Sequence, residues 1–291
     1  MRTDSSYWVE CGFRVFQAFP YHWLIRPSEK ELTGLLTSHP AIGLRYSTPL
    51  DMPEGCLSYH AVFEESAYDV KKIGKKARYD VRLGLKSCEI KRISFEQLAQ
   101  EGWWLQKDTL DRQGRNVTAA MESWKTLCRA AADLPGFEAW GALVGGRLAA
   151  SLIAFQMGGC CYILSQQSLR EFLLMRVNNA LSYVVTQTMV SRPGVKGILY
   201  GLHSLDAPAS VDEFKFRMGY TAKPVRQRVV FHPCLKPFFN RYSHAAVKRL
   251  LAWRPGDPTL AKAEGMMRFY LEGKRPLAKQ QRPECLMDRI F

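Results

Sequence analysis

The sequence lacks the features that mark several large classes of protein. None of its eight cysteines forms a CxxC pair, and the adjacent Cys160 and Cys161 would point to opposite faces of a strand. Because this spacing suits neither a zinc site nor a disulfide framework, we expect free, buried thiols and no bound metal. No apolar run approaches the ~20 residues that cross a bilayer, and acidic residues occupy the N-terminal segment where a signal peptide is apolar. These absences predict a cytoplasmic protein.

Acidic residues are scarce over most of the chain. The first 70 residues hold five Lys or Arg and nine Asp or Glu, whereas the rest holds 36 basic and 18 acidic residues, and the formal net charge is +14. Such asymmetry predicts an anionic partner, which could be a phosphate group, a nucleic acid or a membrane surface. No repeat or long linker separates the parts, so we expect them to pack together.

The densest positive charge lies at residues 71–86, KKIGKKARYDVRLGLK, which contain one acid, Asp80. Apolar residues recur every three or four positions, which predicts one helix with Gly74 inside it. Cations step along a neighbouring face, and Arg78 and Arg82, one turn apart, are spaced to hold a phosphate, with Lys75 adding to the field. The alternative is a solvated face that pairs with acids elsewhere. The scarcity of acids within the segment favours phosphate binding.

The centre of the chain has the clearest pattern. Three apolar runs, 136–144, 146–157 and 160–168, are divided by Gly-Gly pairs, which predicts a β-meander. A polar loop, a helix that starts at Asn178 or Asn179, and a buried strand over 194–202 follow.

A short helix capped by Ser210, with Glu213 three residues on, and a last strand over 223–233 complete the central part.

The flanking segments are predicted to be mixed at the N-terminus and helical at the C-terminus. Residues 1–54 are expected to pack on a core formed by residues 55–233, and residues 234–291 to form a basic helical extension. Within the first segment, residues 28–36 are expected to form a short helix capped by Ser28. Between the basic segment 71–86 and the first central apolar run, helices are expected over 94–114 and 118–134, and Ser94 is expected to cap the first of them.

This order of elements resembles the GNAT acyltransferase fold. Three stretches narrow the resemblance to its FemAB-like branch: FKFRMGY (214–220), KKARYDVRLGLK (75–86) and NNALSYVV (178–185). The resemblance covers about residues 55–232. It implies an α/β (α+β) fold with a mixed, mainly antiparallel sheet flanked by helices and followed by the helical extension, with residues 1–54 as a possible degenerate half-GNAT unit.

The resemblance also implies an activity. Proteins of this kind transfer an acyl or aminoacyl group from acyl-CoA or aminoacyl-tRNA to an amine, so the expected partners are a phosphate-bearing donor, either acyl-CoA or a charged tRNA, and an amine acceptor. One departure stands out. GNAT enzymes hold pyrophosphate on a glycine-rich loop, but QQSLREFLLMRVNN (166–179) has no glycine. The helix start near Asn178 and Asn179 remains as the expected phosphate site.

The resemblance places Lys215 beside the reacting ester of the donor, where its ammonium would oppose the developing oxyanion, with Phe214 next to it. The alternative is an exposed lysine on an amphipathic turn. His203, after a buried strand, is a candidate general base, although most lone histidines are structural.

Two further groups are candidates. Asp111 is a candidate for holding the acceptor amine, while Asp108 and Arg112 are most simply paired with each other at i,i+4. Gln166, at the end of the third apolar run, is spaced to bind a donor or simply ends the strand.

A different class of function is also compatible with the composition. Residues 234–291 carry 12 basic and five acidic residues with several aromatics. They are expected to form amphipathic helices, which in a non-catalytic GNAT-like protein would bind RNA or an anionic membrane.

Overall fold

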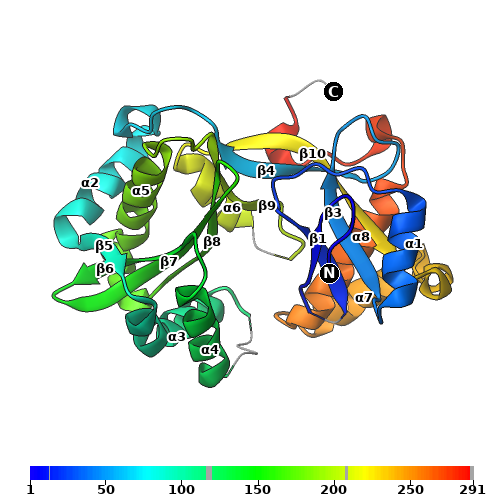
Figure 1. Ribbon diagram of the computed structural model, residues 1–291, viewed down its shortest axis with the longest axis horizontal. Helices are drawn as coiled ribbons and strands as arrows, with labels where there is room; N and C mark the ends of the chain where they lie inside the picture. The colour runs from blue at the N-terminus through cyan, green and yellow to red at the C-terminus, as the bar shows by residue number, and fades with distance from the viewer. Residues whose placement is uncertain (13, 116–119, 207–208, 289–291) are drawn as a thin grey trace. The chain divides into compact units, whose positions relative to one another are not determined.

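The computed structural model (Figure 1) describes residues 1–12, 14–115, 120–206 and 209–288, without the side chains of residues 209 and 210. Ten strands in this part of the chain are ordered β1-β2-β3-β10-β4-β9-β8-β7-β6-β5 in one sheet. The pairs β2–β3 and β8–β9 are parallel, and those of β1–β2, β3–β10 and β5 to β8 are antiparallel. The predicted mixed, mainly antiparallel sheet with flanking helices is confirmed.

The chain divides into two compact units. Unit 1 comprises Met1–His60, Leu202–Ala207 and Ala222–Phe291, and unit 2 comprises Ala61–Gly201 and Pro208–Thr221. The predicted segments 1–54, 55–233 and 234–291 divide the chain differently, because the first and the last fall in the same unit. Local sequence patterns do not report such long-range association.

The β-meander predicted from the glycine pairs is present in unit 2. It consists of β6 (Phe137–Val144), β7 (Arg147–Met157) and β8 (Cys160–Ser168), with β5 (Glu89–Ile93) on the outer side of β6 and β9 (Gly197–Leu202) beyond β8. Both glycines of each turn have positive φ, from +55° to +83°. This backbone conformation matches two-residue hairpin turns and explains why glycine is used there.

Helices cover both faces of this sheet (Figure 1). One core joins alternate strand residues, such as Trp140 and Leu152, to α2 (Lys75–Ser87) and α5 (Val177–Val190). The other core joins the strand residues on the opposite face, which include Ile153, to α3 (Phe95–Arg112) and α4 (Met121–Ala132). The two-residue period of the strands separates the two cores.

The basic helix begins later than predicted. Residues 70–72 form a short 3-10 turn, η1 (Val70–Lys72), and Gly74 is the N-cap of α2, with φ −59° and ψ 154°, so it stands before the helix instead of within it. A second glycine, Gly84, lets α2 approach α5 closely. A Cβ at Gly84 would lie 2.6 Å from the carbonyl oxygen of Arg176 and 2.8 Å from the Cβ of Ala180.

The start of α5 also differs from the prediction. The 3-10 turn η2 (Arg170–Met175) occupies the loop, and Arg176, in the left-handed region at φ 58°, is the N-cap. Asn178 and Asn179 therefore lie in the first turn of the helix, and no side chain caps its N-terminus. A non-glycine residue rarely has such a φ, so conformational propensity does not predict that the helix starts at Arg176.

In unit 1, helices also cover both faces of the strands. The strands are β1 (Tyr7–Glu10), β2 (Val15–Phe19), β3 (Gly43–Thr48), β10 (Thr221–Phe231) and β4 (Cys56–Phe63). Helix α1 (Glu29–Ser38) packs on one face through a core that includes Leu44 and Val230. Helix α8 (Pro258–Gly273) packs on the other through Val229 and Phe231, and α7 (Arg241–Trp253) contacts α8.

Several local predictions are confirmed. Ser28 and Ser94 cap α1 and α3, accepting hydrogen bonds from the backbone N–H groups three residues on. Helix α6 (Ala209–Arg217) ends before Gly219, which has φ +86°. The predicted Ser210 cap lies outside the described side chains.

The short 3-10 turns η3 (Pro233–Phe238), η4 (Leu277–Lys279) and η5 (Glu284–Leu286) complete the elements. None of the eight cysteines forms a disulfide, although three of them, Cys11, Cys234 and Cys285, are exposed and not buried as expected. Within the described residues, no helix combines the length and apolarity that crossing a bilayer requires.

Candidate functional site

In unit 2, the ladder between β8 and β9 is short. The strands pair from Cys160 and Gly197 to Tyr162 and Leu199, although β8 continues to Ser168 and β9 to Leu202. On its other side β8 stays paired with β7 to its end, with a bulge where Ile153 and Ala154 face Ser165 and Ile163. The main chain of β8 from Ile163 to Gln167 is thus an edge on the β9 side, where a ligand amide can pair with it.

Side chains connect the two strands beyond the end of the ladder. The Tyr200 hydroxyl donates to Oε1 of Gln166, and Nε2 of Gln166 donates to the backbone oxygen of Asn178 at 2.9 Å. Gln166 is therefore held from β9 and from the first turn of α5 at once. Of the two readings of Gln166, the structure shows a residue fixed in a polar network.

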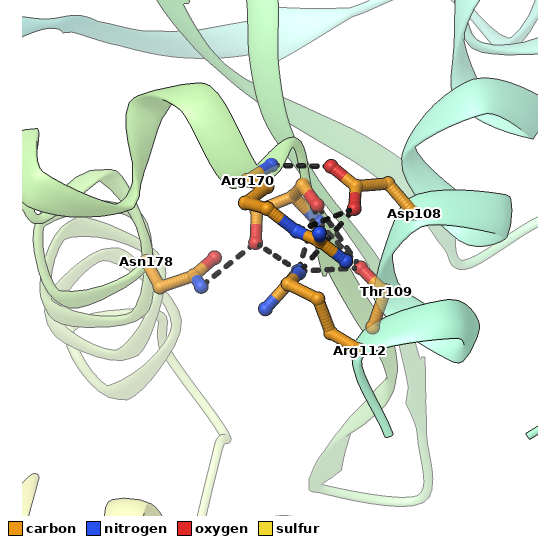
Figure 2. A network of polar contacts seen from close by, with 6 residues as sticks. Asp108, Thr109, Arg112, Arg170 and Asn178 are labelled. Atoms are coloured by element: carbon orange, nitrogen blue, oxygen red, sulfur yellow. Dashed lines mark hydrogen bonds and ion pairs between the residues drawn. The ribbon is translucent and has the colours of Figure 1, made fainter. Parts of the chain in front are cut away.

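The network continues to α3 (Figure 2). Nδ2 of Asn178 donates to the Ser168 hydroxyl at 2.9 Å, and Nη2 of Arg112 donates to the Ser168 carbonyl oxygen at 2.8 Å and to its hydroxyl at 3.1 Å. Thr109 Oγ1 accepts from the Ser168 backbone N–H at 3.0 Å. Burial lowers the pKa of Arg112, and the nearby carboxylate of Asp108 acts in the opposite direction.

The predicted Asp108–Arg112 pair is present, with 3.6 Å between Oδ1 and Nε. Asp108 also accepts a hydrogen bond from the backbone N–H of Arg170 and pairs with its side chain (Figure 2). Asp111 is exposed and lines a shallow hollow of about 580 Å³ with Asp108, Arg170 and Trp104. Its proposed contact with an acceptor amine stays a prediction.

Lys215 is buried, with 8% of its surface exposed, so it is not the exposed lysine of the alternative reading. Its Nζ lies 2.6 Å from Oδ1 of Asp212 on the same helix and 5.6 Å from the ring centroid of Tyr200. A Cβ at Gly201, which has φ +141°, would lie 3.6 Å from Nζ. The ammonium is therefore already neutralised by a carboxylate, while Phe214 packs on the sheet core.

Tyr200 belongs to this site although no motif of the sequence points to it. Burial raises the pKa of its hydroxyl well above the usual value, so the phenol stays protonated and acts as a hydrogen-bond donor, not as a base. The only sequence signal for it is its position in a buried strand that leads to a polar loop. Its contact with Gln166 joins residues 34 positions apart.

The cations of α2 differ in their surroundings. Asp80, the one acid of the segment, pairs with Arg176 at 3.0 Å and so joins α2 to the start of α5. Arg78 is half-buried and its Nε has no hydrogen-bond partner among the described residues, whereas Arg82 and Lys75 are exposed. The unpaired Arg78 is the strongest candidate among them for an anion contact.

The first turn of α5 is a second candidate for an anion contact. It is uncapped by side chains, and helix N-termini of this kind favour anions. Asn178 is committed to Ser168 and Gln166, and Nδ2 of Asn179 lies 3.6 Å from Sδ of Met218. Main-chain N–H groups are thus better placed than the two amide side chains to meet a phosphate.

His203 belongs to unit 1, not to the unit that holds Lys215. Its ring stacks on Tyr59, with centroids 4.6 Å apart and an interplanar angle of 16°, and its Nδ1 lies 3.3 Å from the Ser58 hydroxyl. These contacts fit a structural histidine. The other five histidines also lie in unit 1, at positions 22, 39, 60, 232 and 244, so unit 2 contains none.

Comparisons with known proteins agree with this architecture. No family model and no curated protein matches the sequence. The FemX crystal structure superposes with a TM-score of 0.53 at 12% identity over 76% of this chain and 82% of the FemX chain. The C-terminal domain of a candidate lysylphosphatidylglycerol synthetase from Agrobacterium fabrum gives 0.50 at 10% identity over 84% and 83% of the two chains. At these identities the likeness concerns the fold alone, and it agrees with the GNAT-like α/β fold that the sequence predicted.

Proposed function

We propose that the protein is an acyl- or aminoacyl-transferase that moves the acyl group of a phosphate-bearing donor, acyl-CoA or aminoacyl-tRNA, to an amine. The observation that carries the proposal is the end of the β8–β9 ladder, where an open main-chain edge meets the Tyr200–Gln166–Asn178 network. The fold shared with FemX supports it but does not select a donor.

The donor is proposed to lie along β8 after Tyr162. A donor that carries amide or ester groups next to its reacting carbonyl can pair with the open main chain there, as an added strand would. The network behind this edge is rigid because Gln166 and Ser168 are each held by two or more hydrogen bonds. Such a preorganised surface fixes the carbonyl for attack.

The phosphate groups of the donor are proposed to meet the first turn of α5 and Arg78. The helix start is uncapped, and the adjoining α2 contributes exposed cations. A charged arginine beside main-chain N–H groups is a combination that binds phosphate without a glycine-rich loop.

In the reaction, the amine nitrogen forms a bond to the donor carbonyl carbon, and the bond from that carbon to the thiol sulfur or ribose oxygen breaks. The amine loses a proton, and the leaving group gains one. The Tyr200 hydroxyl, which its raised pKa keeps protonated, is proposed to turn its one proton from Oε1 of Gln166 to the oxygen that becomes negative. Lys215, with Asp212, is proposed to position the Tyr200 ring and not to act as a free charge.

Donor binding and transfer test the proposal separately. Purified protein is titrated with acetyl-CoA and with charged tRNA, and each radiolabelled donor is then incubated with a panel of amino acids and polyamines. We expect one donor to bind and to give an amide product. Tyr200→Phe should lower turnover about 100- to 1,000-fold with donor affinity retained.

Arg78→Gln should instead weaken donor binding by about 10-fold with little change in turnover of bound donor. Tyr242→Phe and Arg249→Gln, on the exposed surface of α7, are the matched controls. Full activity of Tyr200→Phe, or the failure of both donors to bind, would remove the proposal.

A second candidate function rests on α7. This helix exposes Tyr242 at 88% and Trp253 at 83%, and Phe238 just before it is 68% exposed. Arg241, Lys248 and Arg249 lie among them on exposed positions, so aromatic and cationic side chains share one surface, as in helices that lie on anionic bilayers.

Sedimentation with phosphatidylglycerol vesicles checks this function. Binding that falls steeply with salt and is lost in Tyr242→Ser/Trp253→Ser supports it, whereas equal binding to phosphatidylcholine vesicles contradicts it. Preferential binding of RNA under the same conditions would point to the nucleic-acid alternative.

A further inference from the structure

Unit 1 contains a cavity that the proposed transferase activity does not use. Its volume is about 380 Å³, within the range of small-molecule sites. Most of its wall is apolar, formed by Ile42, Leu205, Phe231, Phe239 and Met266. All the lining residues come from β2, β3, β10, α8 and the loops beside them, within one unit.

A buried cation lies in the wall of this cavity. Arg45 on β3 is only 8% exposed, and burial lowers its pKa to about 10, so it is charged at neutral pH. Its Nε donates to Oε1 of Gln227 at 2.9 Å, and its Nη2 donates to the same oxygen and to the His203 carbonyl oxygen at 2.8 Å. Both acceptors are neutral. No carboxylate of the described residues lies within ion-pair distance of the guanidinium.

One end of this guanidinium is left for a ligand. Nη1 of Arg45 donates to no described residue, while Nε and Nη2 are held by Gln227 and His203. The far side of the group is therefore fixed, and its orientation is set before any ligand arrives. A buried charge without an ionic partner is costly, and an anion in the cavity would offset that cost.

The remaining charges narrow the class of ligand. Asp206 and Lys262 also line the cavity, so with Arg45 they leave one net positive charge. A single negative charge is therefore favoured over the two of a phosphate monoester. A planar guanidinium matches a planar carboxylate, and the apolar wall matches an apolar body.

We infer that the unit 1 cavity binds a small monocarboxylate with an apolar body, whose carboxylate meets Nη1 of Arg45. The ligand is either a medium-chain fatty acid or an aromatic carboxylate, since both share this chemistry. The inference does not depend on the transferase proposal, because every residue that it uses lies in unit 1.

Isothermal titration of the full chain with decanoate, 3-phenylpropanoate and decanol tests the inference. We expect at least one carboxylate to bind with a 1:1 stoichiometry, and decanol to bind at least about 10-fold more weakly than decanoate if decanoate is the ligand that binds. The carboxylate that binds distinguishes the fatty-acid source from the aromatic one. The inference is overturned if decanol and decanoate bind equally, or if neither carboxylate binds at millimolar concentration. It is also overturned if the site binds decyl phosphate alone.

Two variants assign the site. Arg45→Gln should weaken carboxylate binding at least about 10-fold, and Ala263→Trp, which fills the cavity from α8 and keeps Arg45, should abolish it. Lys30→Gln removes an exposed cation from α1 and should bind as the wild type does. Because Arg45→Gln can also lower stability, the Ala263→Trp result decides the case. Wild-type binding by a folded Ala263→Trp protein would place the ligand elsewhere and refute the inference.

Discussion

Lys215 in unit 2 and Arg45 in unit 1 are both buried cations, and their surroundings differ in charge. Lys215 in unit 2 has a carboxylate, Asp212, 2.6 Å away on its own helix. Arg45 in unit 1 is held by the neutral oxygens of Gln227 and His203. Both are 8% exposed, so their burial does not explain the difference.

The difference separates a positioning charge from a binding charge. A buried ammonium with its own carboxylate is neutral as a pair and offers little attraction to a further anion. A buried guanidinium with neutral acceptors keeps its charge for whatever enters the cavity beside it. On this ground we propose that Lys215 holds Tyr200 in place, that Arg78 is the cation that meets the donor in unit 2, and that Arg45 binds an anion of its own in unit 1.

The largest effect is expected from removing the partner of Lys215. Asp212→Asn leaves a buried ammonium without a countercharge, which should lower the free energy of unfolding by about 3–5 kcal/mol in urea denaturation. Asp212→Asn/Lys215→Met should recover most of the loss. Glu213→Gln, on the exposed neighbouring position, is the control and should change stability by less than about 0.5 kcal/mol. A small loss in Asp212→Asn would mean that the pair is not important for the fold.

A pH effect should act on unit 1, which holds all six histidines. Burial, with Lys223, His22 and Arg45 nearby, lowers the pKa of His60 to about 3, and its Nε2 lies 2.8 Å from the Ser47 hydroxyl. The unfolded chain takes up a proton near pH 6.5, which the folded chain resists until about pH 3. Stability is therefore full above pH 6.5 and falls at lower pH, by at most about 1.4 kcal/mol per pH unit.

Urea denaturation between pH 7 and pH 5 measures this slope. His60→Gln should flatten the profile, and His39→Gln, at an exposed site, should leave it as in the wild type. An unchanged slope in His60→Gln would show that another group causes the pH dependence.

A smaller loss is expected from removing the neutral partner of Arg45. Gln227→Leu deprives the guanidinium of one acceptor but of no countercharge, so we expect about 1–3 kcal/mol in the same denaturation assay. The loss should stay below that of Asp212→Asn. A larger loss would mean that the amide of Gln227 matters as much as a carboxylate does.

The smallest effects concern two helical glycines, one in each unit. Gly84→Ala forces α2 away from α5, and the overpacking, partly offset by better helix propensity, should cost about 1 kcal/mol. Gly34→Ala in α1 meets nothing within 4 Å and should raise stability by about 0.5–1 kcal/mol. Thermal unfolding of the two variants compares the packing in the two units. Equal shifts in Tm would contradict the close contact at Gly84.

Much of the fold was predictable because short stretches of sequence determine it. The glycine pairs at 145–146 and 158–159 predict the meander, and Ser28 and Ser94 predict two helix starts, all within a few residues. The errors arose where tertiary packing decides. Gly74 caps α2 instead of lying within it, and Arg176 starts α5 in a conformation that few arginines adopt.

The candidate sites were only partly predictable. Asp212 and Lys215 are three residues apart, so their pairing could have been read from helical spacing. Tyr200 and Gln166 meet across the end of a ladder, and Arg45 and Gln227 are 182 residues apart. No spacing rule reaches such pairs, because only strand order brings them together.

The open edge of β8 has a consequence for how such a protein can change over time. A ligand that pairs with main-chain N–H and C=O groups makes few demands on the side chains of the strand that holds it. Substitutions at residues 163–165 and 167 can then accumulate as long as the strand keeps its shape and Gln166 and Ser168 keep their contacts. Proteins that hold their ligands in this way can share an architecture long after their sequences have ceased to look alike.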